Sequence, residues 1–260
     1  MDMDIDLSGR VVAVTGASSG IGEATALACA EAGAAVSLAA RRTERIEALA
    51  ERIAADGGRA VAIETDVADE AQARRFVERT RDQLGRLDAL INNAGVMLLG
   101  PIEDAPTEEW RRMVDVNLMG VLYCTHAALP VMREQGGGHI VNVSSVAGRV
   151  ARAGAGVYNL TKFGIGAFSE ALRQEAVPHG IRVTLVEPGA VTTELQGHNR
   201  EPVREMMAAR FEGVTPLEPG PRDPLRARPA GRRRGQRDAR AARDPGQLSP
   251  TPGSPSRARA

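Results

Sequence analysis

Tyr158 and Lys162 lie four positions apart in VYNLTKFGIG (157–166), and Lys162 is the only lysine among the 33 basic residues of the chain. At the start of a helix this spacing places both side chains on one face, with Cβ atoms roughly 5–6 Å apart. A free phenol has a pKa of about 10, and a nearby cation favours the phenolate. The pair therefore predicts a proton donor or acceptor whose pKa Lys162 lowers, although the pattern alone also fits two surface residues of a helix.

Other polar residues follow apolar runs that read as buried strands. Ser144 and Ser145 end the run IVNVSS, and NNAG (92–95) ends the run before it. The carboxyl ends of parallel strands meet at one sheet edge, where ligands bind. We expect these groups to gather there with Tyr158. Asn117, inside the apolar segment DVNLMG, could join them or could serve only to satisfy backbone groups.

A glycine-rich turn, TGASSGIG (15–22), follows the first apolar run and opens a helical segment. Gly16 permits a tight exit from the strand, and Gly20 and Gly22 permit close approach of backbone to a pyrophosphate. The helix N-terminus presents unpaired N–H groups to the anion. Structural glycines are common in loops, but the strand–turn–helix context favours a dinucleotide site.

Two arginines lie at the positions that would contact the adenosine ribose of a bound dinucleotide. Dinucleotide sites selective for NAD place an acidic residue about 20 positions beyond the turn, whereas this chain has Arg41 and Arg42. A guanidinium binds a 2′-phosphate through charge-assisted hydrogen bonds. We therefore expect NADP(H), the alternative being a solvated arginine pair at a strand end.

The elements that must position these residues alternate along the chain. We predict strands at 11–16, 34–40, 60–67, 87–95, 138–145 and 182–189, each apolar on both faces. Helical segments lie near 21–32, 43–56, 69–85, 107–134 and 157–178, and another helix could cover 199–213. This alternation predicts an α/β fold with a Rossmann-type, doubly wound parallel sheet in three layers.

Composition limits the class of protein. The N-terminus, MDMDIDLSGR, lacks an apolar signal-peptide core, and no run of 18 apolar residues predicts a transmembrane helix. Cys29 and Cys124 lack metal-ligand spacing, so we predict no metal site and two reduced thiols in a cytoplasmic protein.

The formal net charge is zero, but basic and acidic residues are unevenly distributed along the chain. Residues 220–260 hold 11 arginines and 3 aspartates, and they contain no Val, Ile, Met or aromatic residue. Such a segment cannot bury enough apolar surface to offset its ordering entropy. We predict an NADP-binding catalytic domain at 1–215 and a disordered Arg/Pro/Gly/Ala-rich tail at 216–260. The tail has no interleaved aromatic residues, so we do not expect it to bind nucleic acid.

The set of motifs resembles the short-chain dehydrogenase/reductase family. The family's motifs occur here in the family's order, over about 1–215. They are TGASSGIG, Asp66, NNAG, Asn117, Ser145, Tyr158-x-x-x-Lys162 and Pro188-Gly189. Ser145 lies 13 residues before Tyr158, the family's spacing, which selects it over Ser144. The segments MLLGPIEDA (97–105), AGRV (147–150) and EPGAVTTELQGH (187–198) are similar to the clavulanate dehydrogenase (clavaldehyde reductase) branch.

The resemblance implies a role for each matching residue. Tyr158 would be the general acid/base, Ser145 would hydrogen-bond the substrate oxygen, and Lys162 would lower the Tyr158 pKa and bind the nicotinamide ribose. Asn117 would anchor a water in a proton relay. The implied cofactor-binding set is Thr15, Gly16, Ser18, Ser19, Gly20, Ile21, Gly22, Arg41, Arg42, Asp66, Val67, Asn93, Ala94, Gly95, Tyr158, Lys162, Pro188, Gly189, Val191 and Thr193.

The resemblance implies an NADPH-dependent oxidoreductase that interconverts a carbonyl and an alcohol on a small molecule. It also implies a homodimer or homotetramer formed through the long helices near 107–134 and 157–178. The chain departs from the family at its end, where the usual final helix and seventh strand are missing. The alternative is therefore an NADP-binding protein of the same fold with impaired catalysis.

Overall fold

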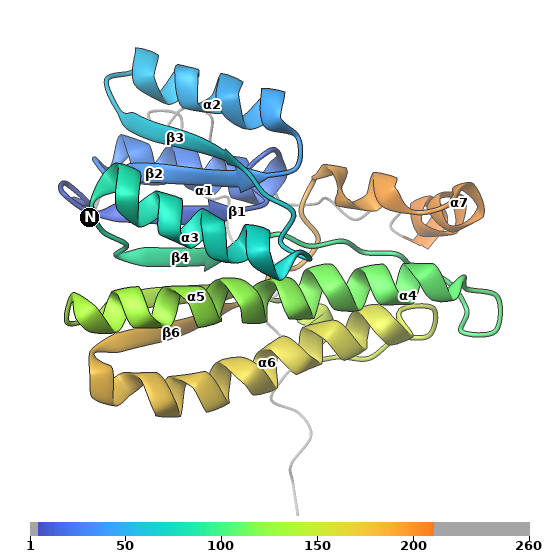
Figure 1. The fold of residues 1–260 in the computed structure, drawn as a ribbon. Coiled ribbons are helices and arrows are strands. Elements are labelled where there is room, and N and C mark those ends of the chain that lie inside the picture. Colours follow the sequence, from blue (N-terminus) through green and yellow to red (C-terminus); the bar gives the residue numbers. More distant parts are fainter. Residues whose placement is uncertain (1–4, 211–260) are drawn as a thin grey trace, which may run out of the picture. The chain divides into compact units, whose positions relative to one another are not determined.

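The computed structural model describes residues 5–210, drawn in colour in Figure 1. The predicted tail at 216–260, the domain boundary before it and the missing final helix and strand all lie outside the described residues. The predicted helix at 199–213 corresponds to α7 (Glu201–Arg210) within this range.

Six parallel strands form one sheet in the order β3-β2-β1-β4-β5-β6, which confirms the predicted doubly wound fold. The strands are β1 (Val11–Thr15), β2 (Ala35–Ala40), β3 (Arg59–Glu64), β4 (Ala89–Asn92), β5 (Gly138–Val143) and β6 (Ile181–Val186). Every residue of β1 is buried, because helices cover both faces of the centre of the sheet.

Helices pack on both faces of the sheet. On one face, α1 (Gly20–Glu31) and α2 (Thr43–Ala55) bury residues such as Ala26 and Ile46 against β1 and β2. On the other, α3 (Glu70–Leu84), α5 (Gly120–Glu134) and α6 (Gly156–Ala176) contribute Phe76, Met132 and Leu172 to a second cluster. The result is three layers with two apolar cores.

The predicted helix at 107–134 contains a local irregularity. It is divided into α4 (Thr107–Val114), a π-helical turn at Asp115–Met119 and α5, which run end to end beside α6 (Figure 1). Asn117 sits in this π turn and is 1% exposed. π turns inside α-helices are frequent at functional sites, so this irregularity marks the position of Asn117.

Thr107–Glu134 is also long and apolar enough, by length and composition alone, to cross a membrane. In this structure its inner face contributes Cys124, Ala128 and Met132 to the core cluster that packs on the sheet. The apolar residues of this inner face are therefore explained by their packing on the sheet.

Several strands end earlier than predicted. The observed strand ends two or three residues before the predicted end in β3, β4, β5 and β6. The residues that follow form loops at the carboxyl edge of the sheet. The expectation that every strand is apolar on both faces is wrong for β6. Arg182, Thr184 and Val186 are exposed along one face, because no described helix covers β6 on that side.

Short helical turns complete the connections. The 3₁₀ turns at Val146–Gly148 (η2), Val177–His179 (η3) and Glu194–His198 (η4) follow β5, α6 and β6 respectively. The first and last of these turns stand at the carboxyl edge of the sheet, where Ser145, the N-cap of η2, and residues of η4 line the cavity described below.

Two helical glycines give a test of the packing between α5 and the loop after β3. A Cβ at Gly120 would lie 2.7 Å from Val67 Cγ2, whereas one at Gly166 on α6 would meet only Leu185 Cδ2, at 3.9 Å. We expect Gly120→Ala to destabilise the protein by about 1–3 kcal/mol through overpacking. Gly166→Ala should instead stabilise it by about 0.5–1 kcal/mol through helix propensity. Urea unfolding of both variants measures this, and equal shifts would contradict the close approach.

Candidate active site

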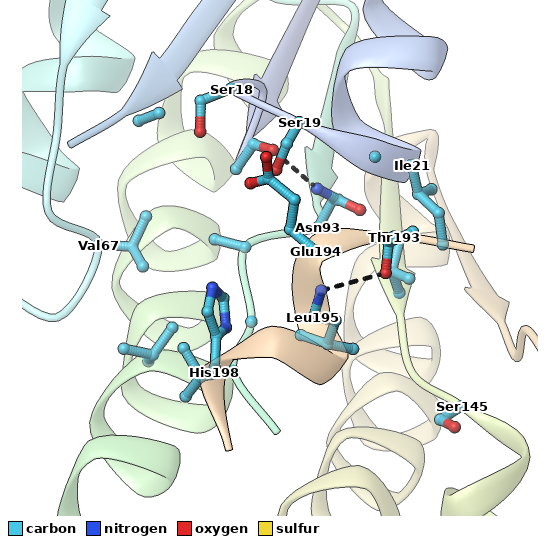
Figure 2. Close-up of a pocket in the computed structure, with 18 of the residues that line it drawn as sticks. Ser18, Ser19, Ile21, Val67, Asn93, Ser145, Thr193, Glu194, Leu195 and His198 are labelled. Carbon is cyan, nitrogen blue, oxygen red and sulfur yellow. Dashed lines mark hydrogen bonds between the residues drawn. The ribbon is translucent and has the colours of Figure 1, made fainter. Parts of the chain in front are cut away.

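A cavity of about 310 Å³ opens at the carboxyl edge of the sheet, where the chain switches direction between β1 and β4 (Figure 2). Most of the predicted site residues line it. These are Gly16, Ser18, Ser19, Gly20, Ile21, Arg41, Arg42, Asp66, Val67, Asn93, Ala94, Gly95, Ser145, Tyr158, Lys162, Pro188, Gly189, Val191 and Thr193. Thr15, Gly22 and Asn117 do not line the cavity, and each instead supports residues that do.

Hydrogen bonds join the ends of β1 and β4 behind the cavity. The Thr15 hydroxyl oxygen accepts from the backbone N–H groups of Asn93 (3.0 Å) and Ala94 (3.1 Å). The Asn93 amide donates to the backbone carbonyls of Thr15 (3.0 Å) and Gly16 (3.3 Å). Asn93 therefore fixes the glycine-rich turn, a role that its membership of the implied cofactor-binding set did not specify.

The glycine-rich turn has the close packing that its sequence predicts. Gly16 has φ +66°, and a Cβ there would lie 2.8 Å from Ala94 Cα. A Cβ at Gly22 would lie 2.3 Å from the Gly16 carbonyl oxygen, so Gly22 serves packing behind the turn. Ser19, the N-cap of α1, makes no side-chain capping hydrogen bond. The N–H groups at this helix end are thus available to an anion, which fits the pyrophosphate of a dinucleotide.

The two predicted arginines take different partners. The Arg42 guanidinium donates to the Ser18 hydroxyl from Nε (3.1 Å) and Nη2 (2.9 Å), and to the Ser19 hydroxyl from Nη2 (2.8 Å). Arg41 lies 3.8 Å from the carboxylate of Asp66, which also accepts from the backbone N–H of Ala68. Arg42 is thus attached to the phosphate-binding turn, and Arg41 to the loop after β3.

Tyr158 and Lys162 lie together in the cavity wall, each only 6% exposed. The ammonium is 5.8 Å from the centre of the phenol ring and donates to the Val143 carbonyl at 2.9 Å. Burial lowers the Lys162 pKa to about 8, because desolvation disfavours the charged form. At neutral pH the ammonium is still mostly protonated.

The expected depression of the Tyr158 pKa is wrong for this structure. Burial raises the Tyr158 pKa, and the nearby Ser145 hydroxyl opposes this effect only in part. The ring packs in a small apolar cluster with Val96, Leu98 and Met113, where a phenolate would be poorly solvated. Tyr158 is therefore held as a neutral phenol, the form that can donate a proton.

The two serines at the end of β5 have different surroundings. Ser144 is buried, and its hydroxyl donates to the Lys162 carbonyl at 3.0 Å. Ser145 is partly exposed, and its hydroxyl oxygen accepts from the Ala147 backbone N–H at 3.1 Å. Because that contact uses only a lone pair, the Ser145 hydroxyl proton can be donated to the neighbouring Tyr158 phenol or to a ligand.

The Asn117 side chain is fully engaged with the protein. Its Oδ1 accepts from the Val96 N–H at 2.8 Å, and its Nδ2 donates to the Val96 carbonyl (2.9 Å) and the Thr161 hydroxyl (3.1 Å). It thereby ties the π turn to the chain after β4 and to α6. A water held by Asn117 would have to bind its backbone rather than its amide.

Sequence reasoning missed several residues at the cavity. Glu194, Leu195 and His198 line it from η4, the turn that follows β6 (Figure 2). Glu194 forms ion pairs with Arg42 at 2.7 Å and with Arg45 at 2.8 Å. An acidic residue in the segment after the last strand was visible in the sequence, but nothing in its spacing indicated that it would meet the arginines after β2.

Within the described residues, no group of three or more His, Cys, Asp or Glu side chains could hold a metal ion. Cys124 is fully buried, and desolvation raises its thiol pKa to about 12. Its environment fits the predicted reduced, unreactive thiol.

Comparison with known proteins gives consistent matches. The family model for short chain dehydrogenase matches residues 10–204. An uncharacterized oxidoreductase of Staphylococcus saprophyticus is 45% identical over 192 residues, which cover 73% of this chain and 77% of that protein.

Solved structures give the same picture. A short-chain type dehydrogenase/reductase from Mycobacterium marinum superimposes with a TM-score of 0.76 at 36% identity, covering 83% of this chain and 85% of the other. A short chain dehydrogenase/reductase from Burkholderia phymatum, solved in complex with NAD, has a TM-score of 0.76 at 25% identity, covering 82% and 83% of the two chains.

The buried ammonium predicts a pH dependence of stability. The folded-state pKa of Lys162, about 8, lies below its ordinary value of 10.5, so the unfolded chain binds more protons between these pH values. The stability of the wild type relative to Lys162→Met should therefore rise as pH increases from 8 to 10.5. The expected change is roughly 1.4 kcal/mol per unit of pKa difference.

Denaturant unfolding of both proteins at pH 7 and at pH 10.5 measures this difference. Cys124, whose pKa burial raises, titrates in both proteins, and repeating the comparison in a Tyr158→Phe background removes the coupling between Lys162 and the phenol. A stability difference that stays constant between these two pH values would contradict the buried, destabilised ammonium.

Proposed function

The chain belongs to the short-chain dehydrogenase family, and from that premise we propose that it is an NADPH-dependent oxidoreductase. It would interconvert an aldehyde or ketone and the corresponding alcohol on a small molecule. The observation that carries the proposal is the convergence of Tyr158, Lys162 and Ser145 on one cavity that also contains the glycine-rich turn and Arg42. One end of this cavity can bind anions, and the other can donate protons.

In the direction of reduction, NADPH held by the glycine-rich turn and Lys162 would supply a hydride to the carbonyl carbon. Tyr158 donates its phenolic proton to the carbonyl oxygen, and the Ser145 hydroxyl hydrogen-bonds the same oxygen as negative charge develops on it. Burial keeps Tyr158 protonated, which suits an acid. The Lys162 ammonium, 5.8 Å from the ring centre, would stabilise the phenolate that is left behind, and Lys162 would also hold the nicotinamide ribose.

Asn117 takes a positioning role in this proposal. Its side chain is 1% exposed and holds the backbone of Val96 at the cavity wall. A proton relay from solvent to Lys162 would therefore run through a water bound to the backbone carbonyl of Asn117. Asp66 and Val67 would bind the adenine, and Pro188, Gly189, Val191 and Thr193 would hold the nicotinamide end.

Arg42 supports the preference for NADPH. Its guanidinium donates hydrogen bonds to Ser18 and Ser19 of the phosphate-binding turn, a position that suits a group that binds a 2′-phosphate. The Burkholderia phymatum relative was solved with NAD, so the preference needs a direct test on this chain.

Other parts of the proposal rest on the sequence. The segments 97–105, 147–150 and 187–198 favour the clavulanate dehydrogenase-like branch, which would make the substrate a small aldehyde. A cytoplasmic location fits a cofactor of intracellular metabolism. A homodimer or homotetramer would bury the exposed Leu160 (61%) and Phe163 (43%) of α6.

The alternative function is an NADP-binding protein that has lost turnover. Titration with NADPH and a panel of aldehydes separates the two functions. Cofactor binding without oxidation of NADPH would favour the alternative.

Removing one hydroxyl tests the proton donor. Tyr158→Phe should lower turnover by on the order of 10²–10⁴ while NADPH binding is unchanged, because only the proton transfer is lost. Tyr123→Phe is a matched control, since Tyr123 lies on α5 away from the cavity. Initial rates of NADPH oxidation and cofactor titrations measure both effects. Turnover retained in Tyr158→Phe would refute the assigned role.

Removing the guanidinium tests the cofactor preference. Arg42→Ala should weaken NADPH binding by about tenfold or more, one charge-assisted contact being worth at least about 1.4 kcal/mol, and should leave NADH binding nearly unchanged. Arg74→Ala, on the exposed face of α3, is the control. Calorimetric titrations with both cofactors give the ratio, and an equal loss for NADPH and NADH would argue against 2′-phosphate recognition.

A further inference from the structure

Glu194 extends from η4 across the mouth of the cavity. Its Oε2 lies 2.7 Å from Arg42 Nη1, and its Oε1 lies 2.8 Å from Arg45 Nη1. Figure 2 shows the carboxylate directed toward Ser18 and Ser19, and the Glu194 side chain is 46% exposed. A residue of the segment after β6 is thus bound to the first turn of α2.

The same guanidinium serves the phosphate-binding turn and Glu194. Arg42 donates to Ser18 and Ser19 with Nε and Nη2, and to Glu194 with Nη1. The positive site expected to receive a 2′-phosphate is therefore already occupied by a carboxylate of the protein itself.

This contact also restrains the segment that covers the cavity. Among the described side chains of 189–198, Glu194 is the only one with an ion pair or hydrogen bond to a residue outside the segment. The chain is fixed again just downstream. Asn199 accepts from the Leu99 N–H at 2.7 Å, and Arg200 pairs with Glu109 at 2.9 Å. Release of Glu194 would free η4 while its downstream end stays in place.

We propose that Glu194 determines cofactor specificity by competing with the 2′-phosphate for Arg42 and Arg45, and that phosphate binding releases η4 from the arginines. The inference rests on the proposed function in that it assumes an adenine dinucleotide in this cavity. A phosphate monoester carries more negative charge than a carboxylate and has three acceptor oxygens, so it can replace Glu194. A cofactor with a 2′-hydroxyl lacks this charge and leaves the contacts of Glu194 intact.

Glu194 carries its negative charge, and can compete with a phosphate, at every physiological pH. Hydrogen bonds from Arg45 and Arg42 lower the Glu194 pKa to about 2, so its carboxylate is ionised. The measured dissociation constant of a ligand rises in inverse proportion to the fraction of protein that is free to bind it. If about nine in ten molecules hold Glu194 on the arginines, the 2′-phosphate binds about tenfold more weakly than it would without this contact.

Two adenosine probes without nicotinamide isolate this subsite from catalysis. Adenosine 2′,5′-bisphosphate carries the 2′-phosphate, and adenosine 5′-monophosphate lacks it. Calorimetry with Glu194→Gln should show binding of the bisphosphate tightened by about five- to tenfold, with binding of the monophosphate unchanged. Glu170→Gln is a matched control, because Glu170 is also paired with an arginine and also has a pKa lowered to about 2, but lies on the outer face of α6.

Hydrogen exchange gives a second readout that does not depend on affinity. In the wild type, the bisphosphate should speed exchange of the backbone amides in 193–198, and the monophosphate should not. In Glu194→Gln these amides should exchange fast before any ligand is added. Unchanged or slower exchange in the wild type with the bisphosphate would overturn the release of η4.

The outcomes separate this inference from the proposed function. If the wild type prefers the bisphosphate and Glu194→Gln changes nothing, the competition is wrong and the NADPH preference stands. If the wild type prefers the monophosphate and only Glu194→Gln prefers the bisphosphate, the competition is right and the NADPH preference is wrong. Equal binding of both probes by both proteins would overturn the inference and the preference together.

Discussion

The junction between β1 and β4 is the constraint on which the cavity depends. Chain connections leave these neighbouring strands toward opposite faces of the sheet, so a crevice opens between them. Thr15 and Asn93 close the base of that crevice with hydrogen bonds that cross from one strand end to the other. The glycine-rich turn is held against β4 at a distance that leaves no room for a Cβ at Gly16. The turn, the start of α1 and the chain leading to Asn117 all take their positions from this junction.

Burial divides the cavity into two chemical environments. Around Tyr158 and Lys162 the protein excludes water, so desolvation acts against charge on both groups and brings the Lys162 pKa close to neutrality. At the other end Arg42 and Arg45 remain about half exposed, and their charges are balanced by Glu194. Ionic contacts there are screened by solvent and exchange readily, which suits recognition and release of an anion. The buried end suits transfer of a proton at a fixed position.

The fold and most of the site could be predicted from local patterns. Apolar runs alternating with helical segments gave six strands in a doubly wound sheet, because a buried parallel strand and its crossover helix have distinct periodicities. The spacing of Tyr158 and Lys162 placed them on one helix face, and both line the cavity. Three expectations failed or were incomplete. The Tyr158 pKa is raised, β6 has an exposed face, and Glu194 was not recognised.

These failures share a physical cause, which is that burial and long-range pairing are not local properties. The sequence by itself determined which residues could do chemistry and the order of the elements that carry them, since side-chain type, helical spacing and strand periodicity are fixed by neighbours in the chain. Only the tertiary structure decided how those groups behave. The packing of Val96, Leu98 and Met113 sets the polarity around Tyr158. The return of the chain after β6 brings Glu194 to Arg42, 152 residues away in sequence, because all strands deliver their loops to the same edge of the sheet.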